Sequence, residues 1–436
     1  MVHPPVSRRS FLKSSAALAA APLLQPWRTS PGETLNVACV GVGGQGGYDL
    51  QQVASGKNVR IVALCDVDAN HLGQAAERHE GARTFADFRR MFDAMAKDLD
   101  AVVVSTPDHM HGSVALAAMR LGKHVYCQKP IAHNLHECRR MAEVAAAQRV
   151  VTQMGTQIHA HEAYRTAVAT LQSGVLGKVR EAHLWVGKSW AGPAAGRPAR
   201  KDPVPEALAW DLWLGAAPER PFVQGLYHPA NWRGWLDFGS GTLGDMGCHI
   251  FDPVFTALGL GAPRTVTSHG PQHHAETFAG DEDVRYTFGG TAHTVETLPL
   301  RWTDGSVRPD AARAQLAKDA KLPGSGSFLV GEKGVMVLPH WSMPSLYADG
   351  KKLDVPLVER AATNHYHEWT DACRGEGETT TPFAYAGPLT EAVLVGTIAG
   401  RFPGKALQWH SDELKFDAKE ATALVKRSYR EGWEIA

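Results

Sequence analysis

A glycine-rich loop between an apolar run and a helical pattern restricts the fold of this chain more than any other feature. The run 35–40 (LNVACV) leads directly into Gly41, Gly43 and Gly46, spaced as G-x-G-x-x-G, and a helical pattern begins near Tyr48. The first glycine permits a tight turn, the second lets the backbone approach a pyrophosphate, and the third lets helix and strand pack closely. The helix N-terminus then faces the phosphates. We therefore expect a dinucleotide-binding fold; the alternative is a glycine-rich turn that binds no nucleotide.

A second apolar run, 59–64, supports this interpretation because Asp66 follows it. An acidic residue at that place, about twenty residues after the glycines, can accept hydrogen bonds from the adenosine ribose. Neither Val67 nor Asp68 offers a positive charge for a 2′-phosphate, so NAD is favoured over NADP. The cofactor contacts expected from this region are Gly41, Val42, Gly43, Gly44, Gln45, Gly46 and Asp66.

Strand and helix patterns continue to alternate as far as residue 129, which predicts a doubly wound parallel sheet. In such a sheet the segments 106–111 and 128–130 lie at the same edge as the glycine loop. They add further expected cofactor contacts, with one more from the start of the next domain: Thr106, Pro107, Asp108, His111, Gln128, Lys129 and Gln157. The expected elements are strands 100–105, 124–127 and 150–154, helices 69–78, 113–121 and 135–148, and a helix that ends near residue 96.

Lys129 stands between a polar residue and Pro130, at the end of a short apolar run. Proline pushes the residue before it out of the helical region, toward an extended or turn conformation. If the run is a parallel strand, Lys129 lies at its carboxyl end, where open α/β sheets bind ligands. The lysine would then stand between a cofactor and a substrate. The alternative is that Lys129 is one of many solvated surface lysines.

Two motifs resemble the Gfo/Idh/MocA oxidoreductases, which are nicotinamide enzymes that act mostly on sugars, cyclitols and their derivatives. The motifs are V-S-T-P-D-H-M-H at 104–111 and G-K-H-V-Y-C-Q-K-P at 122–130, both after the glycine loop. The usual family motif is E-K-P, and here Gln128 replaces the glutamate while Lys129 and Pro130 are kept. The replacement removes a negative charge beside the lysine.

The second half contains G-S-G-T-L-G-D-M-G-C-H at 239–249. Asp245 and His249 are four residues apart and would share one face of a helix. A carboxylate beside an imidazole can hold its tautomer and raise its basicity; the alternative is a helix-start aspartate with a surface histidine. The stretch is similar to the family's G-G-G-x-x-x-D-x-G-x-H motif. The resemblance implies that Lys129, Asp245 and His249 are the catalytic lysine, aspartate and histidine.

The remaining second half reads as an α+β domain with a large, predominantly antiparallel sheet, which the family resemblance implies to be open. The family resemblance implies that this sheet faces the nicotinamide and carries the contacts of a homo-oligomer, a dimer or a tetramer. We expect His159, Trp232 and Arg233 to border the substrate together with the catalytic residues, although tryptophan rings here could equally pack a lid or core. The expected elements are helices 163–173, 389–401 and 418–430 and strands 179–187, 265–268, 284–288, 293–298, 327–331, 334–338 and 345–348.

The N-terminus resembles a twin-arginine (Tat) export signal. S-R-R-S-F-L-K at 7–13 precedes a short apolar run, 14–24, which is too short to span a membrane. The alternative is a basic amphipathic helix. We expect residues 1–30 to be the signal, 31–155 the NAD-binding Rossmann domain and 156–436 the substrate-binding and oligomerisation domain, in a periplasmic protein without a membrane span.

Charge and cysteine usage narrow the possible partners. Lys+Arg and Asp+Glu number 45 each, so nothing in the net charge asks for nucleic acid or an acidic membrane as a partner. The six cysteines are scattered without a C-x-x-C pair, and the Tat route carries proteins already folded in a reducing cytosol. We therefore expect free buried thiols and no metal site.

The function expected from these residues and the resemblance is NAD-dependent oxidation of a carbohydrate at a secondary alcohol. His249 would act as acid/base, Asp245 as its orienter, and Lys129 would bind the reacting oxygen; the sequence leaves open whether Lys129 and His249 exchange roles. Because free NAD is scarce outside the cytosol, we expect a tightly bound, recycled cofactor. The alternatives are an NAD-dependent glycoside hydrolase that works by transient C3 oxidation and elimination, and a non-catalytic sugar-binding protein.

Overall fold

Six parallel strands form the first sheet of the computed structural model, which describes residues 33–318 and 320–435. Their order is β3-β2-β1-β4-β5-β6, so the direction of winding reverses between β1 and β4 and opens a crevice at the carboxyl ends of these strands. The strands are β1 (Leu35–Val40), β2 (Val59–Cys65), β3 (Arg83–Phe85), β4 (Ala101–Val104), β5 (His124–Gln128) and β6 (Thr152–Gly155). The sequence AVVV of β4 is buried throughout because helices cover both faces.

Five helices connect these strands, and the predicted doubly wound sheet is confirmed. They are α2 (Gln45–Ala54), α3 (Ala69–Arg78), α4 (Phe88–Met95), α5 (Asp108–Arg120) and α6 (Leu135–Gln148). The start of α5 differs from the prediction, because the helix begins at Asp108 and not at Ser113. Pro107 precedes its first turn and the carboxylate of Asp108 lies in that turn, where it favours a helix N-terminus.

Ten strands form the second sheet, in the order β14-β13-β12-β11-β7-β10-β9-β8-β15-β16. All pairs are antiparallel except β7 with β10. The strands are β7 (Val179–Val186), β8 (Thr265–Ser268), β9 (Asp283–Gly289), β10 (Thr297–Thr303), β11 (Ser325–Gly331), β12 (Gly334–Pro339), β13 (Ser345–Ala348), β14 (Lys351–Lys352), β15 (Leu407–His410) and β16 (Lys415–Phe416). The predicted strand 293–298 was misplaced, because 291–294 forms a hydrogen-bonded turn. The position of β10 follows from an alternating pattern in which the side chains of Leu298, Leu300 and Trp302 are all buried.

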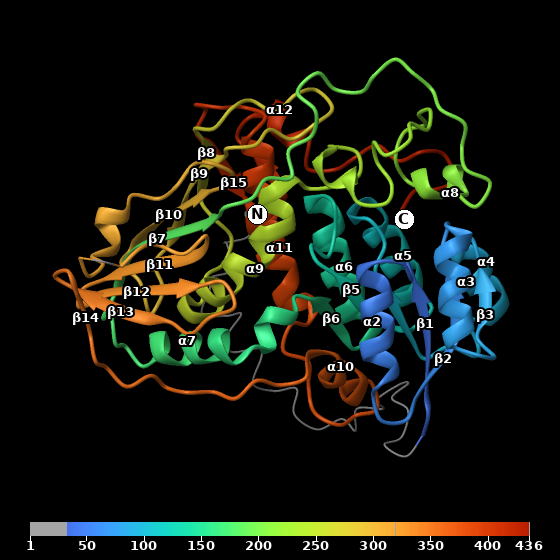
Figure 1. Ribbon diagram of the computed structural model, residues 1–436, viewed down its shortest axis with the longest axis horizontal. Helices are drawn as coiled ribbons and strands as arrows, with labels where there is room; N and C mark the ends of the chain where they lie inside the picture. The colour runs from blue at the N-terminus through green and yellow to red at the C-terminus, as the bar shows by residue number, and fades with distance from the viewer. Residues whose placement is uncertain (1–32, 319, 436) are drawn as a thin grey trace, which may run out of the picture.

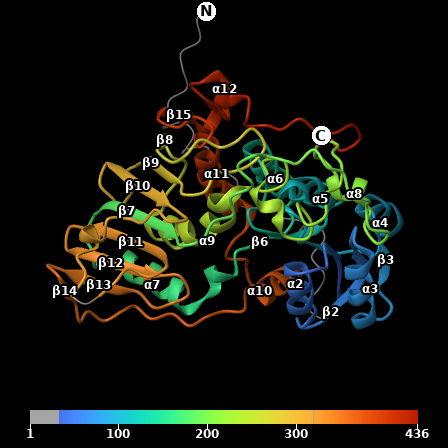
Figure 2. The same cartoon turned by 45° about the horizontal axis from the view of Figure 1, so that its top comes forward.

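Helices fill the space between the two sheets (Figure 1). The turned view in Figure 2 also places α9 (Gly241–Leu258) and α11 (Phe383–Ala399) between them. The buried helix α11 contacts α9 on one side and α6 on the other. The other helices are α7 (Glu162–Gln172), α8 (Trp210–Leu214), α10 (His365–Cys373) and α12 (Lys419–Thr422), with the 3-10 turns η1 (Gln157–Ala160), η2 (Asn231–Gly234), η3 (Ala311–Ala314) and η4 (Ser411–Glu413).

Two segments of the second half return to the first sheet. Helix α10 packs on α2, and Asn364 caps its N-terminus as expected for an asparagine before a helix. The predicted helix 418–430 was wrong beyond the four residues of α12. Two local turn bonds follow α12, from Leu424 N to Ala421 O and from Val425 N to Thr422 O. Further on, distant groups hold the chain: the backbone N–H of Arg430 donates to Ala216, and its guanidinium donates to Gly215 and to the backbone of Asp211.

The Tat-like segment lies outside the described residues. Within residues 33–318 and 320–435, the helices are all too short or too polar to cross a bilayer. The six cysteines all fall within these residues; each is buried, and none forms a disulfide bond there.

Candidate active site

A cleft of about 590 Å³ opens at the carboxyl edge of the first sheet and is closed on its other side by residues of the second half. It gathers most of the residues that the sequence indicated. Of the expected cofactor contacts only Val42 is absent from its lining; Val42 borders a neighbouring cavity under the glycine loop. Of the expected substrate contacts only His159 is absent. The lining residues named in advance are Gly41, Gly43, Gly44, Gln45, Gly46, Asp66, Thr106, Pro107, Asp108, His111, Gln128, Lys129, Gln157, Trp232, Arg233, Asp245 and His249.

The glycine loop has the close packing that dinucleotide binding requires. Gly41 has a φ of +80°, and a Cβ there would lie 2.5 Å from the carbonyl oxygen of Ser105. A Cβ on Gly46 would lie 2.1 Å from the carbonyl oxygen of Gly41. Asp66 anchors the loop, because its carboxylate accepts the backbone N–H of Val42 at 2.8 Å. Gly43 and Gly44 line the cleft together with Gln45, the first residue of α2, so the start of this helix borders the cleft, which suits a pyrophosphate.

Asp49 is a buried carboxylate beneath this loop that sequence reasoning missed. Four neutral groups donate to it: Ser105 Oγ at 2.7 Å and Gln128 Nε2 at 2.9 Å to Oδ2, and Gln45 Nε2 and Tyr366 OH at 2.8 Å to Oδ1. Burial raises the pKa of Asp49, and these hydrogen bonds oppose the rise. A carboxylate that accepts from four donors is best satisfied in its ionised form, since only that form has no proton of its own to place. The only signal in the sequence was Asp49's position four residues after Gln45 on one helix face.

Lys129 and Asp245 form an ion pair across the cleft. Lys129 Nζ lies 2.8 Å from Asp245 Oδ1 and 2.9 Å from the backbone oxygen of the same residue. Arg233 Nε donates to the same Oδ1 at 3.1 Å. Burial acts to raise the pKa of Asp245, but the charges of Lys129 and Arg233 outweigh it and hold this pKa well below its usual range. The aspartate is therefore ionised at neutral pH and keeps the lysine ammonium at the cleft.

His249 lies one turn further along α9 than Asp245, as predicted, but the two do not form the expected orienting pair. Asp245 faces Lys129 and Arg233, whereas His249 Nδ1 lies 3.4 Å from Thr156 Oγ1. Burial first, and then the positive charge of Lys129, lower the pKa of His249 well below that of a free imidazole. A neutral imidazole at the cleft is the state in which histidine can accept a proton.

The other histidines named in advance have structural partners. His111 lies between the carbonyl oxygens of Thr106 and Pro130, at 2.8 and 2.7 Å, and so ties the start of α5 to the segment after Lys129. His159 was expected to border the substrate, but the structure places it in a separate cavity between α7 and α9. Its Nδ1 lies 2.9 Å from both oxygens of the buried Asp252, and this carboxylate draws the ring away from the cleft.

The start of α9 is linked to the start of α5 by Ser240, which donates to Asp108 at 2.6 Å. Burial raises the pKa of Asp108 to about 7, against the opposing effects of Ser240 and Lys129. Trp232 lies in the lining with the Arg233 guanidinium 4.3 Å above its ring, so its face is covered by a cation in this structure. Trp210 and Trp213, 4.8 Å apart, stack within an apolar cluster that also contains Trp232, and Trp213 and Trp232 border the cleft as well, so these rings pack a core and line the site.

Comparisons with known proteins agree with this geometry. Residues 35–156 match the model of an oxidoreductase family with an NAD-binding Rossmann fold (Gfo/Idh/MocA), and residues 169–297 match that family's C-terminal alpha/beta domain. Residues 5–24 match the twin-arginine translocation signal sequence, which indicates Tat export.

Two curated relatives and one solved structure show what the chain resembles. Inositol 2-dehydrogenase 2 of Saccharopolyspora erythraea is 32% identical over 153 residues, 34% of this chain and 44% of that protein. A glycosyl hydrolase family 109 protein of Solibacter usitatus is 32% identical over 126 residues, 27% of this chain and 29% of that protein. Both matches therefore span less than half of the relative. The WlbA dehydrogenase of Bordetella pertussis, in complex with NADH and UDP-GlcNAcA, shares the fold at a TM-score of 0.61 and 18% identity, over 87% of this chain and 99% of that chain.

Proposed function

The chain belongs to the Gfo/Idh/MocA oxidoreductase family, and from that premise we propose that it transfers hydride between NAD and a secondary alcohol of a carbohydrate or sugar derivative. The observation that carries the proposal is that Lys129, Asp245 and His249 line the same cleft as the glycine loop. At Gly41 and Gly46 the backbone packs so closely that a Cβ would not fit, and the carboxylate of Asp66 is held by the backbone N–H of Val42. Both features fit the binding of a dinucleotide. Bound NAD would supply the hydride acceptor at its nicotinamide.

The side chains of the cleft take complementary parts in this proposal. His249, kept neutral by burial, removes the hydroxyl proton from the reacting carbon's alcohol. Lys129 donates a hydrogen bond to the same oxygen and stabilises its developing negative charge. Asp245 holds the ammonium of Lys129 in place through the 2.8 Å contact and remains ionised throughout.

We further propose that the cofactor is NAD and not NADP, that it is retained during export, and that the destination is the periplasm. A segment of the second half, residues 205–229, lies over the adenosine end of the cleft and is called the strap here. It is bonded to the loop that follows β2: Ala209 N donates to Val67, Ala69 N donates to Ala207, and His228 Nε2 lies 3.0 Å from Asp68. Dissociation of the cofactor would require these bonds to open, which supports slow release.

The experiment that tests the proposal is the nucleotide content of protein purified without its signal and without added cofactor. Denatured protein should release nearly stoichiometric NAD(H) and little NADP(H). Absence of nucleotide, with none taken up at millimolar NAD, would contradict the oxidoreductase assignment. Weak, exchangeable NAD would contradict retention and leave an ordinary dehydrogenase.

A redox-neutral glycoside hydrolase is the second candidate, favoured by the similarity to the glycosyl hydrolase family 109 protein. In that chemistry transient oxidation at C3 acidifies the C2–H, the aglycone is eliminated, water adds, and the ketone is reduced again. Net cleavage of a glycoside without any added acceptor would favour the hydrolase, whereas dependence on a second sugar would favour an oxidoreductase that recycles its cofactor. A protein that binds sugars but converts neither would be the non-catalytic alternative.

A further inference from the structure

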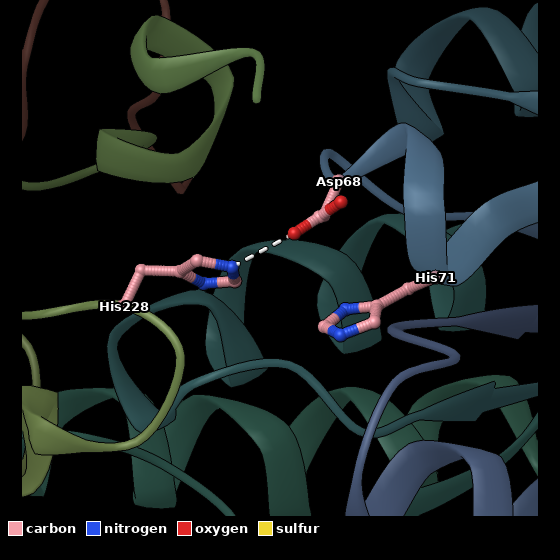
Figure 3. Close-up of side chains that lie close together, drawn as sticks. All are labelled: Asp68, His71 and His228. Carbon is pink, nitrogen blue, oxygen red and sulfur yellow. Dashed lines mark hydrogen bonds and ion pairs between the residues drawn. The ribbon is translucent and has the colours of Figure 1, made fainter. Parts of the chain in front are cut away.

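Asp68, His71 and His228 converge on one small space at the edge of the cleft (Figure 3). Asp68 is the N-cap of α3, and His71 lies in the first turn of that helix. His228 belongs to the strap, 160 residues further along the chain. One ligand atom from each residue lies within 4.8 Å of the others. We propose that these three side chains bind one divalent transition-metal ion of the zinc type.

The donor set suits such an ion. Two imidazoles and one carboxylate are common ligands of Zn²⁺, and three protein ligands with an open fourth position are typical of sites that also bind an exogenous ligand. Asp68 Oδ2 and His228 Nε2 are 3.0 Å apart. Two ligands of one tetrahedral zinc ion, each bonded at roughly 2.0–2.1 Å, are separated by roughly 3.3 Å. Within the described residues the His71 ring has no hydrogen bond, so it can turn toward the other two side chains without breaking one. The Asp68–His228 pair must separate slightly, and the ion takes the place of the proton between them.

Local contacts and burial restrict the directions in which the three side chains can point. Asp68 Oδ1 accepts the backbone N–H of Asn70 at 2.9 Å, which leaves Oδ2 directed at the shared space. Asp68 is nearly buried, and His71 and His228 are half-buried, so none of the three is a freely exposed surface side chain. In metal sites a neighbouring group regularly hydrogen-bonds the atom of the ligating side chain that does not bind the metal, and this bond fixes the direction of the side chain.

The ion would stand beside the proposed nucleotide and would join the two halves of the protein. His71 and His228 both line the cleft, and the His71 ring lies so close to the glycine loop that a Cβ on Gly43 would be 2.2 Å from its Nδ1. Two ligands come from the first half and one from the strap, so the ion would hold the strap closed. Metal binding itself is independent of the proposed chemistry; only its effect on cofactor release rests on the proposed function.

The test measures the metal directly on the complete signal-free chain. Protein treated with a chelator is dialysed against micromolar Zn²⁺, and bound zinc is counted by mass spectrometry; Co²⁺ is added separately and its visible bands report a tetrahedral site. We expect about one ion per chain, and a zinc affinity in His71→Ala and in His228→Ala that is weaker by at least the roughly 10- to 100-fold that loss of an outer-shell partner costs. The control variant is His269→Ala, at an exposed histidine directly after β8, and it should bind zinc as tightly as the wild type does.

Two results would overturn the site: no stoichiometric zinc at micromolar concentration, or equal zinc affinity in the wild type and both variants. In the first case the contact between Asp68 and His228 is only a hydrogen bond that holds the strap to the first half of the chain. His71 is partly exposed and bears no hydrogen bond among the described residues, so its replacement leaves folding intact and the comparison valid. NAD(H) content, measured on the same samples, separates the two proposals, because bound NAD without zinc would refute the metal site and leave the oxidoreductase standing.

Discussion

Gln128 donates from Nε2 to the buried carboxylate of Asp49 at 2.9 Å, while its Oε1 accepts the backbone N–H of Lys129 at 3.2 Å. One amide thus connects a buried negative charge to the backbone of the proposed catalytic lysine. A glutamate at 128, as in the E-K-P motif of the family, would place a second carboxylate against Asp49, whose four partners here are all neutral donors. The glutamine is therefore the residue that fits an aspartate at position 49.

This pairing predicts that substitutions at positions 49 and 128 compensate for each other. Gln128→Glu alone would set two carboxylates at hydrogen-bond distance and raise the pKa of one of them, since like charges this close cannot both ionise. Asp49→Asn alone would replace one of the two acceptor oxygens, each of which accepts from two donors, with an NH2 group, at a cost of about 1–3 kcal/mol. We expect each single variant to lower the unfolding free energy and the turnover, and the double variant Asp49→Asn/Gln128→Glu to recover most of both. Denaturant unfolding and steady-state rates measure this, and purely additive losses would contradict the pairing.

Replacement of Lys129 should abolish chemistry without removing the cofactor. We expect Lys129→Met to lower turnover by about 10²–10⁴-fold, the range for loss of a positioned proton-transfer or oxyanion group, while the NAD(H) content stays near that of the wild type. Lys123→Met is the matched control, because Lys123 lies at the start of the same strand segment but binds the carbonyl of Leu99, outside the cleft. Retention of more than about a tenth of the wild-type turnover in Lys129→Met would contradict the assignment.

The pKa of His249 should lie below the value of 6.5 for a free imidazole and should rise when Lys129 is removed. Burial and the Lys129 charge both disfavour the imidazolium, so the neutral base persists as the pH falls and the acid limb of turnover lies below 6.5. Hydrogen–deuterium exchange at the imidazole C2 position, read by mass spectrometry, gives this pKa in the wild type and in Lys129→Met. The charged or titratable groups that act on His249 are Lys129, His340, Asp245 and Lys188. A pKa at or above 6.5, or no rise in the variant, would contradict this prediction.

Local pattern was enough to predict the first sheet and the position of the cleft. The run AVVV of β4, the glycine spacing and the helix 135–148 all follow from burial and backbone geometry over a few residues. Asp245 and His249 were correctly placed on one helix face because the helical period fixes that relation within the chain.

Partners far apart in sequence could not be predicted in this way. Asp245 binds Lys129, 116 residues away, and so is not the partner of its helical neighbour His249. His159 turns to Asp252, 93 residues away, and leaves the cleft for that reason. The segment after α12 has a helical pattern, yet Arg430 finds its acceptors in 211–216. In each case a long-range charge or hydrogen bond outweighs a local preference.

The strap should slow the release of the cofactor. Ala209→Pro removes the N–H that donates to Val67 O at 2.9 Å, and Ala209 already has a φ of −77°, which proline tolerates. Loss of one such bond, worth about 0.5–1.5 kcal/mol, should speed NAD release about 2- to 10-fold. Ala209→Ser keeps the N–H and is the control. Release is followed by the decay of bound NAD(H) after dilution into nucleotide-free buffer, and equal rates in the two variants would show that the strap does not retain the cofactor.

Asp66 should make the protein select NAD over NADP. Its two carboxylate oxygens accept the backbone N–H groups of Val42 at 2.8 Å and of Asp68 at 2.9 Å, so the carboxylate is fixed at the end of β2 and cannot turn away from a 2′-phosphate. Like charges brought together in this way cost several kcal/mol, and we expect NAD to bind at least about 100-fold more tightly than NADP.

Asp66→Ser should narrow this selectivity to within about tenfold, because the repulsion is removed while a hydroxyl can still reach the ribose. The same variant loses the tether of Val42, so its affinity for NAD should fall as well, and the ratio of the two affinities is the informative quantity. Asp87→Asn is the matched control, since Asp87 caps α4 after the neighbouring strand and lies outside the cleft lining. Comparable affinities for NAD and NADP in the wild type, measured by calorimetry on nucleotide-free protein, would show that Asp66 does not face the ribose.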